Sequence, residues 1–217
     1  MSRFLGLALA LVAAIALAGP SSPPLQEPVQ VPDASSADSL DRKLQLIRQR
    51  HADGAEGPQR FQVTEEEANA YLFYRMSEHL PAEVTAPWVR FGKDEVQGGA
   101  MLDMKLLQAH LSDSSLTRYL QGQVPVEMLA QVHAEEGVGQ VELQSVTLGG
   151  LPVPTTLIQK LLSDYSKNPS LPDGVRLDDT FPLPYGLVSA HFRTGRLTLQ
   201  QGGSQGDKQA HLGSSAQ

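Results

Sequence analysis

The sequence predicts an α+β domain built on a long, strongly curved antiparallel sheet, a meander of hairpins wrapped around an apolar helix, with a second amphipathic helix. Three observations predict it. Apolar residues alternate with period two in segments separated by turn signals, the segment near residue 70 is apolar on nearly all sides of a helix, and the segment near residue 160 carries one wide apolar stripe.

The longest alternation lies in residues 123–150. Every even-numbered residue from Val124 to Ala134 is apolar, which is typical of a strand with one buried face. Glu136 and Gly137 then read as a hairpin turn. That turn predicts three cross-strand pairs: Val132 with Val141, Ala130 with Leu143, and Met128 with Ser145.

Turn residues predict the register of two more hairpins. A turn at Lys93-Asp94 pairs apolar residues across the preceding and following strands, and so does a turn at Thr194-Gly195. The predicted pairs are Phe91 with Val96, Val89 with Gly98, Phe192 with Leu197, and Ala190 with Leu199, and the first face continues through Ala100, Leu102, Met104 and Leu106. Gly98-Gly99 indicates a bend or bulge. We expect all three hairpins to line the inside of one curved sheet.

A helix is predicted to begin after Thr64, because Thr64 and Glu67 have the spacing of a capping box. Its apolar residues lie on nearly every side: Ala68, Ala70, Tyr71, Leu72, Phe73, Tyr74, Met76 and Leu80. A helix of this kind is usually surrounded by protein, so we expect it in the hollow of the sheet. Asn69 lies among these residues and is predicted to hydrogen-bond an exposed backbone group of a neighbouring strand.

Three other helices are expected. The first is capped by Asp38 or Ser39 and ends at Asp53-Gly54, and its basic residues favour either a solvated face or contact with anionic lipid headgroups. A second, short helix is expected around Leu116. The third begins with a capping box of Thr156 and Gln159, ends at Asn168-Pro169, and has a wide apolar stripe: Leu157, Ile158, Leu161, Leu162 and Tyr165.

The ends of the chain differ from its middle in composition. Residues 1–18 have the cationic start, apolar run and small-residue site of a signal peptide. Residues 19–37 form a Pro/Ser-rich linker, residues 38–201 a single domain, and residues 202–217 a polar tail expected to be disordered. The protein is therefore predicted to be exported, periplasmic or extracellular. Cleavage after Ala18 and retention of the segment as a tether are both open.

Composition excludes several classes of function. The chain has no cysteine, which excludes disulfides, thiolate nucleophiles and Cys-based metal sites. Its formal net charge is −7, whereas nucleic-acid binding needs a stripe of basic residues, so the charge argues against a nucleic-acid partner. No motif for a cofactor is present, so no cofactor and no nucleic-acid partner are expected.

Two polar groupings in the sequence are candidate sites. His133, Glu135 and His191 fall on polar faces of their predicted strands, where two histidines and a carboxylate are possible zinc ligands, but a solvated surface is the preferred interpretation. Asp178 and Asp179 are adjacent on an extended chain and so point to opposite sides. No catalytic constellation follows, and the protein is predicted not to be an enzyme and to hold no metal.

Three stretches carry a resemblance to a known family. They are Val63-Thr-Glu-Glu-Glu-Ala-Asn-Ala-Tyr-Leu72 at the first predicted domain helix, Gly149-Gly-Leu-Pro-Val-Pro154 before the last helix, and Phe181-Pro-Leu-Pro-Tyr-Gly186 before the last hairpin. In these and in the order of its elements, the chain resembles bacterial envelope members of the tubular lipid-binding (TULIP-like) superfamily. The resemblance covers about residues 61–200. It implies a bent sheet around a helix, with a hydrophobic groove for acyl chains.

The leading hypothesis is therefore a lipid-binding or lipid-transfer protein of the cell envelope that holds a fatty acyl ligand in this groove. Small and flexible side chains on the inner face favour it, since Met repacks around varied ligands. The predicted groove lining is Leu72, Leu102, Met104, Val126, Met128, Ala130, Val132, Val141, Leu143, Leu161 and Leu162. The alternative is an interaction or assembly module with a fully packed core, whose envelope partner the sequence does not name.

Overall fold

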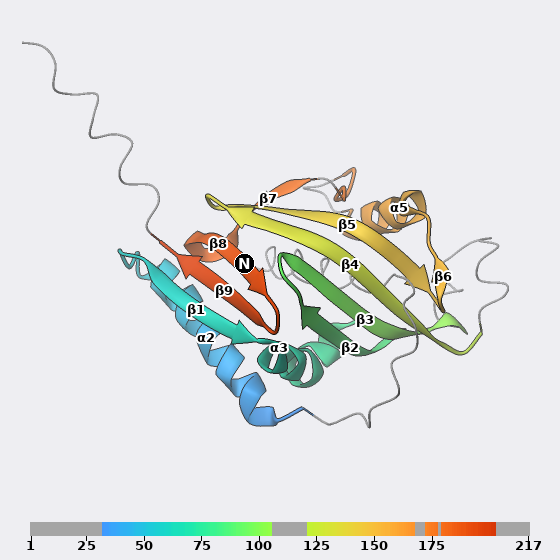
Figure 1. Ribbon diagram of the computed structural model, residues 1–217, viewed down its shortest axis with the longest axis horizontal. Helices are drawn as coiled ribbons and strands as arrows, with labels where there is room; N and C mark the ends of the chain where they lie inside the picture. The colour runs from blue at the N-terminus through green and yellow to red at the C-terminus, as the bar shows by residue number, and fades with distance from the viewer. Residues whose placement is uncertain (1–31, 106–120, 168–171, 178, 203–217) are drawn as a thin grey trace, which may run out of the picture.

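Two antiparallel sheets and a few helices form an α+β fold in the computed structural model (Figure 1), which describes residues 32–105, 121–167, 172–177 and 179–202. The larger sheet has strand order β2-β3-β4-β5-β6, with β7 pairing to β5. The smaller sheet has strand order β1-β9-β8. The predicted class, α+β with antiparallel hairpins, is thus correct.

The larger sheet contains the first two predicted hairpins. Its strands are β2 (Val84–Phe91), β3 (Glu95–Asp103), β4 (Gln123–Glu135), β5 (Val138–Leu148), β6 (Leu151–Pro152) and β7 (Thr180–Pro182). The predicted pairs of Phe91 with Val96 and of Val89 with Gly98 are confirmed. Val132 pairs with Val141 and Ala130 with Leu143, also as predicted.

The predicted pair of Met128 with Ser145 is wrong. A bulge at Gln144 lets Leu129 pair with Ser145, so that Met128 faces Val146 instead. Before the bulge, the odd-numbered residues Val141 and Leu143 pack against the core. Beyond the bulge, the even-numbered residues Val146 and Leu148 are buried in it. The register of β2 with β3 also shifts, between Thr85 and Trp88 of β2. The irregularity predicted at Gly98-Gly99 of β3 therefore lies on the partner strand, β2.

The smaller sheet consists of β1 (Gln59–Thr64), β9 (Arg196–Gln201) and β8 (Leu187–Arg193). The predicted pairs of Phe192 with Leu197 and of Ala190 with Leu199 are confirmed. The expectation that all three hairpins belong to one sheet is wrong, because β8 and β9 pair with β1. Backbone bonds from Asp94 N to Phe192 O and from Gly137 N to Val188 O join the two sheets.

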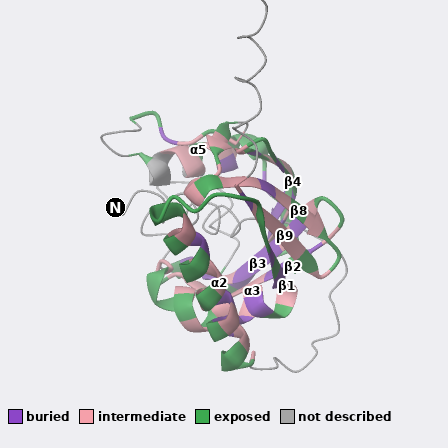
Figure 2. Ribbon diagram, turned by 90° about the vertical axis from the view of Figure 1, so that its left-hand side faces the viewer, coloured by how far each residue is buried: buried purple, intermediate pink, exposed green. Residues whose placement is uncertain are grey.

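The helices lie on one side of the strands, with α2 and α5 at different ends (Figure 2). Helix α2 (Ala34–Ala52) begins earlier than expected because Asp33, not Asp38 or Ser39, caps it by accepting a bond from Ser35 N. Residues 34–37 therefore belong to this helix and not to the linker. Gln201 of β9 donates to Ile47 O, which places α2 against the smaller sheet.

Helix α3 (Glu65–Tyr71) starts with the predicted capping box. It continues as a π-helical turn, η1 (Leu72–Met76), and a 3₁₀ turn, η2 (Ser77–His79). No residue of Leu72–Met76 is buried, and Phe73 is 42% exposed. The expectation that protein surrounds this helix on all sides is therefore wrong, because the helix packs between α2 and β2 with one face left open.

Helix α5 (Thr155–Ser166) follows Pro154 at its N-cap position without a side-chain cap. The predicted capping box of Thr156 and Gln159 is wrong, since Gln159 instead binds the loop 172–177. Its Nε2 donates to Val175 O, and its Oε1 accepts from Leu177 N. A 3₁₀ turn, η3 (Pro184–Gly186), precedes β8.

Several predictions lie outside the described residues. These are the signal peptide, most of the linker, the short helix around Leu116, Leu106, the Asn168-Pro169 stop, Asp178 and nearly all of the polar tail. Among the helices that are described, none has the length and apolar character needed to cross a membrane.

Candidate functional site

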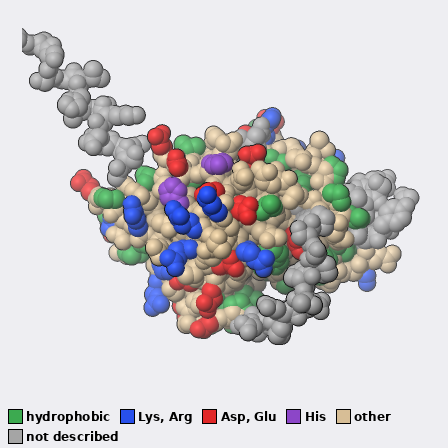
Figure 3. All heavy atoms as spheres, in the orientation of Figure 1, with side chains coloured by type: hydrophobic (Ala, Val, Ile, Leu, Met, Phe, Trp, Pro, Cys, Tyr) green, Lys and Arg blue, Asp and Glu red, His purple; other side chains and the backbone are tan. Residues whose placement is uncertain are grey.

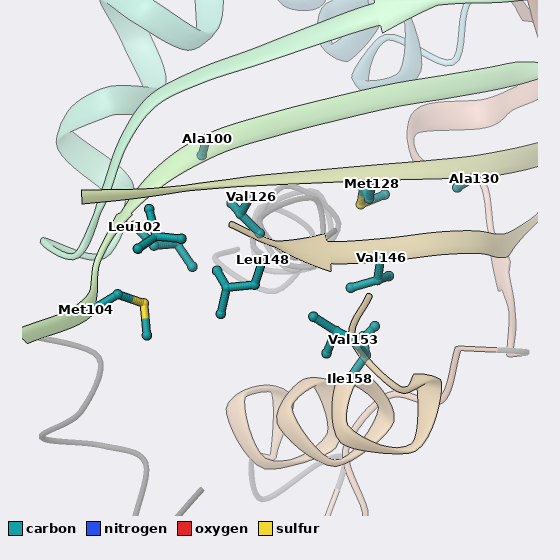
Figure 4. Packing of buried hydrophobic residues seen from close by; sticks show 11 residues of the cluster. Ala100, Leu102, Met104, Val126, Met128, Ala130, Val146, Leu148, Val153 and Ile158 are labelled. Atoms are coloured by element: carbon teal, nitrogen blue, oxygen red, sulfur yellow. The ribbon is translucent and has the colours of Figure 1, made fainter. Parts of the chain in front are cut away.

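The inner face of the larger sheet and helix α5 enclose an apolar cluster, called here the α5 cluster. Side chains of β3, β4 and β5 meet Val153 and Ile158, which lie on the α5 side (Figure 4). The buried members of the cluster are Ala100, Leu102, Met104, Val124, Val126, Met128, Ala130, Val146, Leu148, Val153 and Ile158. Partly buried residues form its margin: Val84, Val141, Leu143, Leu157 and Leu177. The cluster is therefore closed at its centre and partly open at its margin.

Most of the predicted groove lining lies in this cluster. Leu102, Met104, Val126, Met128 and Ala130 are buried in it, and Val141 and Leu143 stand at its margin. The period-two alternation predicted that these residues share one face, because alternate residues of a strand and their cross-strand partners lie on the same side of a sheet.

The remaining predicted lining residues lie elsewhere. Val132 and Leu72 pack against a second group, the α3 cluster, whose buried members are Val89, Phe91 and Val96. Leu162 is half-buried on α5, and the side chain of Leu161 lies outside what the structure describes. The structure thus divides the predicted lining between the two ends of the inner face.

Sequence reasoning missed Val146, Leu148, Val153 and Ile158 as lining residues. A signal for the first two was present, because apolar residues change from odd to even positions between Leu143 and Val146. Such a change of parity within one strand indicates a bulge. Ile158 is 1% exposed, and only the position of α5 over the sheet reveals its role.

Directional bonds fasten the α3 end of the inner face. Asn69 Nδ2 donates to Val89 O at 2.8 Å, and Val89 N donates to Asn69 Oδ1 at 2.8 Å, as predicted for this residue. Phe91 N donates to Glu65 Oε2 at 2.9 Å. The two side chains thus take the place of a further strand along the edge of β2, where unpaired backbone groups would otherwise be exposed. Phe91 also packs edge-on against Phe192, with ring centroids 5.4 Å apart.

A buried carboxylate joins α2 to α3. Glu67 accepts hydrogen bonds from Lys43 Nζ at 2.6 Å and from Ser39 Oγ at 2.5 Å, and Thr64 N donates to it at 2.9 Å. Burial raises the pKa of the Glu67 carboxyl, but the bonds from Lys43, Ser39 and Thr64 outweigh burial and hold this pKa below its usual value. The carboxylate is therefore ionised and structural at neutral pH.

The chemistry of the α5 cluster is that of a hydrocarbon surface. Each of its members is apolar, so it offers no group that could transfer a proton or attack a substrate. Among the described residues, no group of three His, Asp or Glu side chains could hold a metal ion. His133, Glu135 and His191 are all exposed.

Comparison of the chain with models of protein families and with curated protein sequences gave no significant match. The functional argument therefore depends on the chain's own residues.

Proposed function

We propose that this protein is exported and binds the acyl chains of a lipid between the inner face of the larger sheet and helix α5, without catalysing a reaction. The observation that supports it is an α5 cluster made only of aliphatic side chains, whose margin at Val141, Leu143 and Leu157 is only partly covered. Such a margin gives an acyl chain a place to enter between helix and sheet.

Energetics favour this ligand class. Each methylene that leaves water contributes about 0.8 kcal/mol, so six buried methylenes contribute about 5 kcal/mol before the cost of ordering the chain. Met128 and Met104 are flexible and adapt to chains of different length and unsaturation. The ligand then needs no charged anchor within the cluster.

The finer architecture belongs to the same proposal. In the tubular lipid-binding superfamily that the sequence resembles, a long bent sheet wraps around a helix. Here α5 packs on the aliphatic residues of β3, β4 and β5, and the Tyr71 helix packs near β2. The proposed groove is accordingly bounded by β4, β5 and α5.

The test is mass spectrometry of the intact protein as isolated, followed by thermal unfolding of delipidated protein with phospholipids and fatty acids. We expect co-purified lipid and a rise in melting temperature with long-chain ligands. Leu143→Trp fills the margin of the cluster and should reduce uptake. Leu46→Trp is the matched control, because Leu46 is exposed on α2 away from the cluster. Delipidated protein that responds to no phospholipid or fatty acid contradicts the proposal.

A second candidate is an envelope interaction or assembly module whose core is fully packed. The observation that favours it is the complete burial of Met104 and Val126. Dense packing at the centre leaves no room for a ligand unless α5 moves. In that case the Leu143→Trp and Leu46→Trp proteins should be indistinguishable in every lipid assay, and the protein should be isolated with a protein partner.

A further inference from the structure

We propose that the outer face of the three-stranded sheet docks on an anionic lipid surface through Arg60, Arg193 and Arg196. The choice of a lipid surface as the partner rests on the proposed function. The assignment of the face rests on strand register, charge and exposure.

Strand register places the three arginines together. Residues directly opposite each other in an antiparallel pair share a face of the sheet. Arg193 of β8 pairs with Arg196 of β9, which in turn pairs with Thr64 of β1. Arg60 lies on the same face of β1, because it is an even number of residues from Thr64. The other paired positions on this face are Gln62, Ser189, His191, Thr198 and Gln200.

The arginines of this face have no acidic partner within the smaller sheet. None of its paired positions carries an acid, although the chain has 24 Asp and Glu residues and a net charge of −7. Elsewhere Lys43 pairs with Glu67 and Arg75 with Asp38. Within the described part of the chain, no ion pair involves Arg60, Arg193 or Arg196. Because like charges directly opposite destabilise a sheet, the Arg193–Arg196 pair is better explained by an anionic partner than by folding.

The three arginines on this face are exposed, whereas Ser189 of β8 is buried. Helix α2 packs on the other side, where Ile47 O accepts a bond from Gln201. Figure 3 shows Lys and Arg side chains gathered over β1, β8 and β9 on the side turned to the viewer.

The spacing of the arginines fits a surface with several phosphates. The four-residue offset of Arg60 from the Arg196 position spans about 13 Å along the strand, and two strand spacings span about 10 Å across it. A single phosphate cannot contact three groups so far apart. An array of lipid phosphates can, and the planar guanidinium fork matches a phosphate oxygen pair.

The test uses the full chain with vesicles of phosphatidylcholine alone or with one-third phosphatidylglycerol. The triple variant Arg60→Gln/Arg193→Gln/Arg196→Gln should bind the anionic vesicles on the order of 100-fold more weakly, since each basic residue near the surface contributes about fivefold. The control Lys105→Gln/Lys160→Gln/Lys167→Gln removes the same charge from exposed positions off this face and should bind like the parent protein. Parent binding should weaken between about 50 mM and about 300 mM salt.

Several outcomes overturn the inference. They are equal binding by the triple variant and the parent, an equal loss in the control, equal binding of the parent to neutral vesicles, and a preference for a soluble polyanion such as heparin over vesicles. The unfolding midpoint of the triple variant should equal or exceed that of the parent, because a repulsion is removed. Vesicle binding is read separately from bound acyl chains. A parent protein that docks on anionic vesicles but holds no lipid keeps this inference and contradicts the proposed function.

Discussion

The two ends of the inner face of the larger sheet are held in different ways. At the α3 end, Asn69 and Glu65 bond directly to the backbone of β2, and two aromatic rings interlock. At the α5 end, Ile158 and Val153 meet aliphatic side chains of the sheet, and Gln159 directs its bonds to the loop 172–177. The α3 end is therefore fixed by side-chain bonds to the sheet backbone. The α5 end is joined mainly by apolar contact, with a backbone bond from Val153 N to Val146 O just before the helix.

This difference indicates which end of the sheet tolerates a shift of its helix. Directional bonds have narrow distance and angle limits, so the α3 end has one favourable arrangement. Apolar contact depends mainly on buried area and tolerates small shifts of a helix over a sheet. A ligand-binding function is therefore easier to accommodate at the α5 end, while the α3 end keeps the edge of β2 covered.

The largest expected effect compares the packing of the two ends. Phe91→Ala should lower the free energy of unfolding by about 4 kcal/mol, because it removes a buried ring and its contact with Phe192. Ile158→Ala should cost less, about 2 to 3 kcal/mol, because α5 can settle into the space left behind. Urea denaturation of both variants measures the difference. An Ile158→Ala cost equal to or above that of Phe91→Ala contradicts the idea that the α5 end is adaptable.

The next effect tests the directional bonds alone. Asn69→Ala should lower the free energy of unfolding by about 2 to 3 kcal/mol, because it leaves the N–H and C=O of buried Val89 without partners. Asn69→Asp is the matched variant, since it keeps the acceptor for Val89 N and loses the Nδ2 donor to Val89 O and Glu65 O. Hydrogen exchange of the Val89 amide should accelerate in Asn69→Ala and remain slow in Asn69→Asp. Equal exchange in the two variants would show that the side chain does not protect this edge.

A smaller, pH-dependent effect concerns Glu67. Its pKa is lower in the folded protein than in the unfolded chain, so its contribution is complete above the unfolded value of about 4.5 and is lost as the pH falls through the folded value. Glu67→Gln should lower the free energy of unfolding at neutral pH by about 1.5 to 2 kcal/mol, because it removes charge-assisted bonds from Lys43.

The pH profile distinguishes this role from simple packing. The difference between the parent protein and Glu67→Gln should shrink as the pH is lowered below about 4.5, since the parent carboxylate then becomes protonated. Glu66→Gln is the control, because Glu66 is exposed on the same helix. A difference for Glu67→Gln that stays constant down to low pH would contradict the pKa direction.

The sequence predicted the features that depend on neighbouring residues. Turn residues and period-two alternation gave the cross-strand partners of Phe91, Val132 and Phe192, and the Thr64 capping box gave the start of α3. A buried amide had to find partners, so the bonds of Asn69 followed as well. The turns and the capping box are set within a few residues of the chain, whereas Val89, the partner of Asn69, lies in a strand that the sequence did not specify.

The features that depend on distant packing were not predictable in the same way. An apolar helix surface does not specify which part of a sheet it covers, so the Tyr71 helix was expected in the hollow and α5 was given no position, whereas the two helices pack at different ends of the larger sheet. For the candidate site, alternation found the residues of β3 and β4 but not Val153 and Ile158, whose position depends on how α5 returns to the sheet. Within β5 the missing information was local, because the change of parity after Leu143 was readable.

That change of parity leads to the smallest expected effect. Deletion of Gln144 should cost less than about 1 kcal/mol, because it removes the bulge and leaves Leu129 with Ser145 and Ala130 with Leu143 as partners. Deletion of Glu142 is the control, since it forces either Val141 or Leu143 to turn away from the α5 cluster whichever way the strand responds. Its cost should be about 2 kcal/mol or more by urea denaturation. Equal losses of unfolding free energy in the two deletion variants would contradict this. Odd or even position in β5 would then not determine which residues face α5, and the bulge would not be the reason that Val146 and Leu148 face helix α5.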